Sequence, residues 1–148
     1  MRALALIALL VPAAAVAAPD GATLYKRCAA CHLPTGAGVP GTYPPFSTDF
    51  ATLAKKPDGR RYLALAVLRG MSGPITVGGK PYRGVMPAQA GMTDADIAAV
   101  LNHVATKLAK AGAGFKPFTE AEIKGARAAG AALSPAAVGL LHAQVGGK

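Results

Sequence analysis

The feature that most constrains this chain is the run Cys28-Ala29-Ala30-Cys31-His32, which holds both cysteines and one of the three histidines. Two thiols three positions apart lie on one helical turn, so each can add across a vinyl group of the same porphyrin. The residue that follows then directs an imidazole toward the iron. The run therefore predicts one covalently attached haem, held by Cys28, Cys31 and His32, and a chain that folds around it.

Three other kinds of site use paired cysteines: a thioredoxin-like redox pair, half of a zinc site and a small structural disulfide. A thioredoxin-like pair belongs to a βαβ unit, whereas the apolar residues here recur at helical spacing and valine, isoleucine and aromatic residues are sparse. A zinc site needs a fourth ligand and usually a second Cys or His pair, but His103 and His142 are isolated far along the chain. The pattern favours haem over these alternatives.

Residues 1–18 have the pattern of a secretory signal peptide. Arg2 precedes an apolar run over residues 3–11, and small residues lead to a cleavage site expected near Ala17 or Ala18. The run is shorter than the ~20 apolar residues of a membrane span, and a proline interrupts it; an uncleaved anchor is the alternative. Charges and glycines break every later apolar stretch, so we expect no transmembrane span in the mature chain. Export to the periplasm would agree with haem attachment to thiols outside the cytoplasm.

Removal of residues 1–18 leaves 130 of the 148 residues, enough for one small domain. Loss of Arg2 leaves 15 lysines and arginines against 7 aspartates and glutamates, a net charge of +8. This positive field favours redox partners whose docking face is acidic. The chain has no pattern of basic and aromatic residues typical of a nucleic-acid groove, so nucleic acid is not an expected partner.

The spacing of apolar residues predicts an all-α chain. Helices are expected over residues 21–32, 58–69 and 93–108, the last of them capped by its threonine and complemented by acidic residues in its first turn. Glycines and prolines predict a loop over 33–46 that can wrap a prosthetic group. A Gly-Gly pair predicts a short hairpin-like turn over 75–82.

The C-terminal part, residues 111–148, is expected to be a helical extension of a domain that covers residues 19–110. Thr119 and Glu122 fit a capping box, and Ser134-Pro135 fits a cap followed by a proline at the first helical position. The apolar residues of this extension suit two roles. They could clamp the chain into a larger complex, or they could fold back over the domain.

The order of these features is similar to that of a known family. An N-terminal helix ends in the Cys28 to His32 run, a Gly/Pro loop and a middle helix follow, and Gly84-Val85-Met86-Pro87 precedes a final helix with an acidic cap at Thr93. Over residues 21–108 the chain resembles class I c-type cytochromes. The resemblance implies the class I cytochrome c fold, with three to four helices wrapped around one covalent haem c. The run 73–87 further resembles cytochromes that are electron-accepting partners or subunits of periplasmic dehydrogenases.

The resemblance places the second axial ligand of the iron at Met86. A soft, neutral thioether favours the ferrous state and raises the reduction potential. Met71 and Met92 are the competing thioethers, with packing as their alternative role. His103 and His142 could instead give a bis-histidine iron. The family usually has an aromatic residue at position 103, so we interpret His103 as packing against the first helix and His142 as a surface residue.

The same resemblance suggests which groups surround the haem. A ligating imidazole donates its other ring N–H to an acceptor, and the family pattern matches that acceptor to the carbonyl of Pro44. Buried propionates need donors or a positive partner, and ordinary surface polarity is the alternative role of each candidate. The candidate donors are Tyr82, Arg83, Arg60 and Tyr62.

With both axial positions filled by side chains, the iron has no open position for a substrate and can only change its charge. We therefore expect a periplasmic electron carrier, and not an enzyme, that passes single electrons between redox partners linked to a dehydrogenase or a respiratory chain. It could be a free shuttle or a subunit of a dehydrogenase complex. The alternative is a peroxidase-like or ligand-binding haem enzyme in which Met86 dissociates, but no distal His-Arg pair lies near that residue in the sequence.

Overall fold

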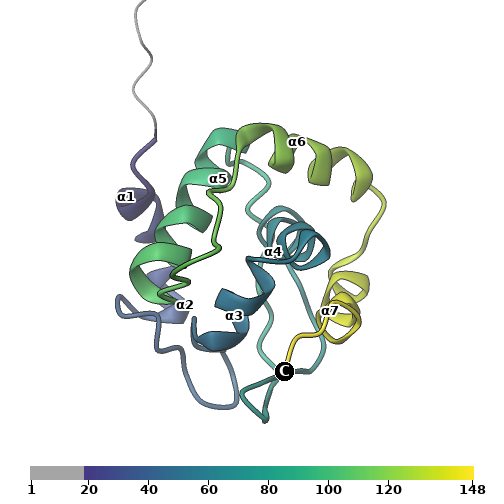
Figure 1. Ribbon diagram of the computed structural model, residues 1–148. Coiled ribbons are helices and arrows are strands. Elements are labelled where there is room, and N and C mark those ends of the chain that lie inside the picture. Colours follow the sequence, from purple (N-terminus) through teal and green to yellow (C-terminus); the bar gives the residue numbers. More distant parts are fainter. Residues whose placement is uncertain (1–18) are drawn as a thin grey trace, which may run out of the picture.

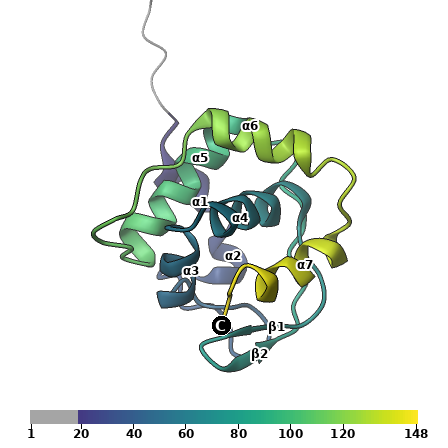
Figure 2. The same ribbon diagram turned by 45° about the vertical axis from the view of Figure 1, so that its right-hand side comes forward.

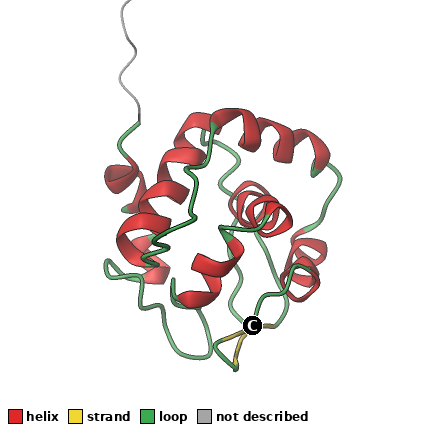
Figure 3. Cartoon of the chain, in the orientation of Figure 1, coloured by secondary structure: helices red, strands yellow, loops and turns green. Residues whose placement is uncertain are grey.

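The computed structural model describes residues 19–148, and in it the other helices surround one central helix, α4 (Figure 1). The elements are α1 (Gly21–Tyr25), α2 (Ala29–His32), α3 (Thr48–Leu53), α4 (Pro57–Arg69), β1 (Ile75–Val77), β2 (Lys80–Tyr82), α5 (Asp94–His103), the π-helical turn η1 (Val104–Leu108), α6 (Glu120–Ala129) and α7 (Pro135–Gln144). The predicted all-α class is confirmed, with one small hairpin as the sheet of the described residues (Figure 3). The expected signal peptide lies outside those residues. None of the described helices is long and apolar enough to cross a membrane.

The first helix is shorter than the sequence predicts. α1 begins after Asp20, whose carboxylate accepts hydrogen bonds from two backbone N–H groups of the first turn, and it ends at Tyr25. A tight turn follows, in which the N–H of Cys28 donates to the carbonyl of Tyr25 at 2.8 Å. α2 then begins after Cys28 and ends before Leu33, which has a φ of 62°. The interruption places Cys28 at the N-terminal cap of a separate short helix and Cys31 within that helix.

α1 crosses α5 at a glycine. A Cβ atom at Gly21 would overlap the carbonyl oxygen of Ala99 in α5, so the two backbones meet without a side chain between them. One turn along, His103 packs on Tyr25 with ring centroids 5.5 Å apart. This contact agrees with the packing role predicted for His103.

α4 is the buried centre of the fold. Its first residue is Pro57, whose fixed φ suits that position. All residues from Tyr62 to Leu68 are buried, which is the pattern of a helix covered on every side. α4 contacts α3, α5, α6 and α7. The sequence predicts α4 almost to its ends, whereas it does not predict the short helix α3.

The hairpin and α5 form where the turn glycines and the capping residues of the sequence predict them. β1 and β2 pair antiparallel, with Ile75 opposite Tyr82, and the turn glycines Gly78 and Gly79 have φ values of 59° and 74°. Those positive angles suit the tight turns that join two strands. Thr93 and Asp96 form a reciprocal capping box at the start of α5. The predicted helix over 93–108 continues after His103 as η1, with wider turns.

The C-terminal extension, residues 111–148, folds back over the rest of the chain. α6 packs on α4 and α5, and α7 packs on α4 and β1 (Figures 1 and 2). Ile123 of α6 and Val138 of α7 are fully buried. These two residues therefore pack within the chain, which agrees with the expected role of folding back over the domain, whereas Leu140 is 70% exposed.

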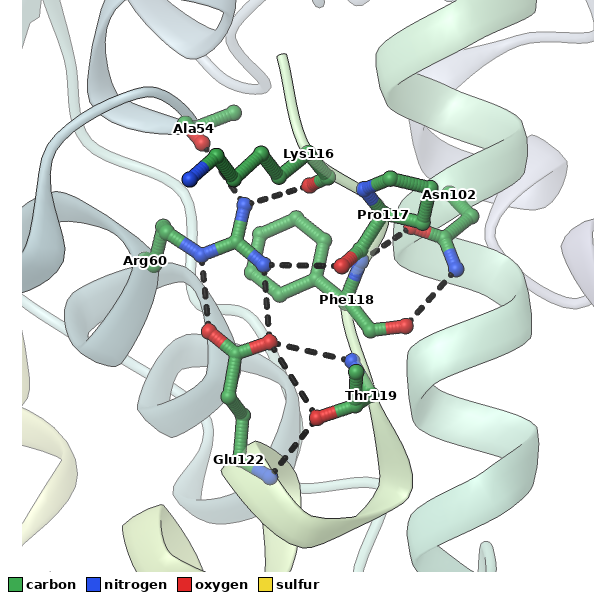
Figure 4. A network of polar contacts seen from close by, with 8 residues as sticks. All are labelled: Ala54, Arg60, Asn102, Lys116, Pro117, Phe118, Thr119 and Glu122. Atoms are coloured by element: carbon green, nitrogen blue, oxygen red, sulfur yellow. Dashed lines mark hydrogen bonds and ion pairs between the residues drawn. The ribbon is translucent and has the colours of Figure 1, made fainter.

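Arg60 of α4 fastens the start of the extension (Figure 4). Its guanidinium group pairs with both oxygens of Glu122 at 2.7 and 2.8 Å. It also donates to the carbonyls of Ala54, Lys116 and Pro117 at 2.9, 2.7 and 3.2 Å. The ring of Phe118 lies below it, with 4.0 Å between the guanidinium carbon and the ring centroid. The Arg60 side chain is only 12% exposed. Its one guanidinium group therefore supplies hydrogen bonds to all of these carbonyls at once.

Glu122 is shared between this network and the cap of α6. Its carboxylate accepts from Arg60 and from the backbone N–H of Thr119. The hydrogen bond from Arg60 is the main cause that lowers the pKa of Glu122. A carboxyl group with a lowered pKa stabilises the fold above its ordinary pKa, and this contribution is lost as the pH falls through the lowered value.

We expect Gly21→Ala to lower the free energy of unfolding by about 1–3 kcal/mol, because the added Cβ forces α1 away from the backbone of α5. Guanidinium chloride unfolding of the haem-loaded protein measures this change. Gly91→Ala is the matched control, since no atom lies within 4 Å of a Cβ at that position. Equal effects of the two variants would contradict the close crossing.

Arg60→Lys should lower the free energy of unfolding by about 1–2 kcal/mol, because an ammonium group keeps the charge but cannot reach Glu122 and three carbonyls together. The same denaturation experiment measures it. Arg61→Lys, at an exposed neighbouring position, should leave the stability unchanged. An unchanged free energy of unfolding in Arg60→Lys would show that the network contributes little to stability.

Candidate functional site

One large apolar cleft lies in the middle of the molecule. It contains about 750 Å³ of space not filled by protein atoms, its open mouth included. Side chains from α2, α3, α4, β1, α5, η1 and α7 line it, whereas α1 and α6 contribute none. Its apolar lining includes Phe50, Leu53, Leu63, Val67, Leu101 and Val104.

His32 lies in the wall of this cleft. The side chain is buried, with Phe46 stacked on it at a centroid distance of 4.4 Å. Its Nδ1 lies 3.0 Å from the carbonyl oxygen of Pro44. A carbonyl can only accept, so Nδ1 carries the proton and Nε2 keeps a free lone pair. Burial lowers the pKa of His32, and the bond to Pro44 acts in the opposite direction. A neutral, oriented imidazole of this kind can ligate a metal.

The two cysteines are free and half-buried. Cys28 lines the cleft, and Cys31 lies on the same helical turn, with its N–H donating to the carbonyl of Cys28 at 3.1 Å. Burial is the main cause that raises the pKa of the Cys28 thiol. Both sulfur atoms remain available for thioether bonds beside the imidazole.

Met86 and Met71 both line the cleft, and their backbones form an antiparallel bridge. The N–H of each donates to the carbonyl of the other at 2.9 Å. The two thioethers differ in their partners, because the hydroxyl of Tyr62 donates to the sulfur of Met71 at 3.6 Å. Met92 is buried and is not among the cleft-lining residues. The cleft therefore offers two thioethers, of which Met71 already has a polar partner.

The residues expected to hold the propionates lie in different places. Tyr62 lines the cleft, and Tyr82 lines a smaller cavity that shares His32, Met71 and Met86 with it. Arg83 is exposed and lines neither space.

Arg60, one of the candidate propionate donors, is engaged elsewhere in the fold. Its guanidinium is engaged with Glu122 and the extension, and it is not among the residues that line the cleft. A carboxylate partner 62 positions away in the sequence cannot be recognised from the residues around Arg60.

Sequence reasoning missed a polar pair in the cleft wall. His142, expected at the surface, is 3% exposed, and its Nε2 lies 2.9 Å from a carboxylate oxygen of Asp49. The backbone N–H of Lys148 donates to the other oxygen of Asp49 at 2.7 Å. The carboxylate and the imidazole form one unit only after folding, because 93 positions separate Asp49 from His142 and α3 is not predicted.

The donor set and the lining fit a haem c group. The Cys28 thiol, an imidazole with a free Nε2, a thioether and an apolar wall meet at one cleft. Cys31 lies on the same helical turn as Cys28. Cysteines bound to the porphyrin through thioether bonds, with imidazole and methionine sulfur as ligands of the iron, are the groups that hold c-type haem. Cys28, Cys31, His32 and Met86 are the residues that could hold it here.

Comparisons with known proteins agree with this geometry. The family model for cytochrome c matches residues 18–107. A cytochrome c-552 of Thermus thermophilus is 48% identical over 122 residues, which cover 81% of this chain and 82% of the relative. A second cytochrome c-552 of the same organism is 49% identical over 111 residues, which cover 74% of this chain and 85% of the relative.

The chain therefore belongs to the cytochrome c family, as a class I monohaem c-type cytochrome that binds one haem c covalently and carries electrons.

Proposed function

We propose that this cytochrome passes single electrons between redox proteins in the periplasm, with His32 and Met86 as the axial ligands of its iron. The observation that carries the ligand assignment is the hydrogen bond between Nδ1 of His32 and the carbonyl of Pro44. It leaves Nε2 as the free nitrogen of a ring that lines the same cleft as the Met86 side chain. Among the cleft-lining thioethers, Met86 is the one without a hydroxyl partner.

Bound haem supplies a metal centre that gains and loses one electron. The residues of the chain set the conditions for that change. Cys28 and Cys31 tether the group next to His32, so that the imidazole is held in place by covalent attachment as well as by Pro44. The cleft lining is apolar, and an apolar surrounding with a low local dielectric keeps the reorganisation on electron transfer small.

The charge of the chain supports transient docking with an acidic redox partner. Without residues 1–18 the protein carries a net charge of +8, and complementary charge raises association rates. We propose that residues 1–18 are a signal peptide that is removed on export, which agrees with attachment of haem outside the cytoplasm. The partner would be a dehydrogenase or a component of a respiratory chain, as the similarity of residues 73–87 to dehydrogenase-linked cytochromes suggests.

The Met86→Ala variant should lose the weak thioether-to-iron charge-transfer band of the ferric protein and should have a lower reduction potential, because the soft axial sulfur favours ferrous iron. Absorption spectra and a redox titration measure both. The matched control is Met71→Leu, a volume-conserving change of the other cleft thioether, which should keep the band. A band that survives Met86→Ala but is lost in Met71→Leu would transfer the ligand role to Met71. High-spin iron in the unchanged protein would favour the haem-enzyme alternative.

Expression of the full chain in a bacterium that attaches haem to exported cytochromes should give a coloured periplasmic protein that begins at Ala18 or Pro19. Its mass should equal that of the shortened polypeptide plus one haem, because both thiols add to the same porphyrin. Intact-mass spectrometry and N-terminal sequencing test this. A retained N-terminus in the membrane fraction would identify residues 1–18 as an anchor instead.

A further inference from the structure

The second half of the extension is attached to the segment that connects α4 with the hairpin. The N–H of Ser72 donates to the carbonyl of Pro135, the first residue of α7, at 3.1 Å. The N–H of Gly78 donates to the carbonyl of Lys148 at 2.7 Å. Arg69 donates from Nε to the carbonyl of Leu133 at 3.0 Å. α7 and its flanking residues thus hold the segment 69–78 at three points.

That same segment holds Met86. Met71, which precedes Ser72, exchanges two backbone hydrogen bonds of 2.9 Å with Met86. Gly70 lies against the Met86 carbonyl so closely that a Cβ there would overlap the oxygen. The path from α7 to Met86 is therefore short. It runs from Pro135 through Ser72 and Met71.

α7 also fits tightly on this path and reaches the cleft. A Cβ at the buried Gly139 would overlap the carbonyl oxygen of Ser72. One turn later, His142 lines the cleft and is bound to Asp49 at 2.9 Å. The ring of Tyr62, whose hydroxyl contacts Met71, lies 5.5 Å from the His142 ring. The position of α7 therefore affects three side chains of the cleft wall, namely His142, Asp49 and Tyr62.

The first half of the extension has no such connection. α6 is fixed by Arg60 with Glu122 and by Arg127 with Asp94. None of its residues lines the cleft. The extension therefore contains one helix that touches the Met86 path and one that does not, which gives a comparison within the same chain.

We propose that α7 is a brace that holds the Met86 segment against the cleft and so keeps the sixth position of the iron closed to external ligands. The inference rests on the proposed ligation by Met86. Movement of α7 away from Ser72 loosens the bridge between Met71 and Met86, and a small basic molecule can then compete with the thioether. His142 and Asp49 are positioning residues in this arrangement, because they fix the end of α7 without being ligands.

The test compares two glycine-to-alanine variants in the full-length, haem-loaded protein. Gly139→Ala places a methyl group where the Ser72 carbonyl lies, whereas Gly125→Ala of α6 places one in open space. Alanine favours a helix over glycine at both positions. Loss of docking in Gly139→Ala therefore cannot come from a weaker helix, and Gly125→Ala serves as the matched control.

The probe is imidazole, titrated into the ferric protein and followed in the absorption spectrum. We expect Gly139→Ala to bind imidazole about tenfold more tightly than the unchanged protein, with a weaker thioether charge-transfer band, because overpacking at one buried methyl displaces the brace. Gly125→Ala should bind as the unchanged protein does. His142→Ala, which removes the contact with Asp49, is the second variant and should also bind imidazole more tightly, even if Gly139→Ala fails to take up haem.

Several results would overturn the brace. Unchanged imidazole binding in Gly139→Ala and His142→Ala would do so, and so would an equal increase in Gly125→Ala, because the effect would then be general loosening. Failure of the proposed ligation has a different signature. In that case the unchanged protein itself lacks the thioether band, or keeps it in Met86→Ala.

Discussion

The whole structure depends on the need to bury one large, flat and mostly apolar haem group together with its charged iron ion. Seven elements of the fold contribute side chains to the same cleft, and its wall is apolar except where a polar group has a partner. His32 is the clearest case, because its ring is buried and yet satisfied by the carbonyl of Pro44. A buried imidazole without that bond would be both costly and free to turn. The loop over residues 33–46 therefore has a fixed path even though it contains no helix.

The parts of the fold that local chemistry determines could be predicted from the sequence. α4 and α5 were expected because their apolar residues recur with the helical period and their first residues suit the start of a helix. The Gly-Gly pair likewise specifies the hairpin by its positive φ values. The haem-attachment residues can be predicted for the same reason, since Cys28, Cys31 and His32 lie within five consecutive positions of the sequence. Met86 was found only through resemblance to a family.

The parts that the sequence did not reveal depend on contacts between distant residues. The break between α1 and α2 is set by hydrogen bonds within a turn that has no glycine or proline to mark it. α3 is short, and its buried face is meaningful only against α4. Arg60 has the character of a surface residue until Glu122 and the carbonyls of the extension meet it. His142 is a polar residue in a mostly apolar helix, and only the folded chain supplies Asp49 as its partner.

The attachment of the chain end at Asp49 has a consequence for how the molecule reaches its native state. The two bonds that Asp49 accepts span 93 and 99 positions. The entropy of closing such a loop grows only with the logarithm of its length, so the span itself takes little from the final stability. The long sequence separation instead slows formation of these contacts during folding, because distant partners must find each other before their contact stabilises the chain. We therefore expect the bonds from His142 and Lys148 to Asp49 to form late in folding.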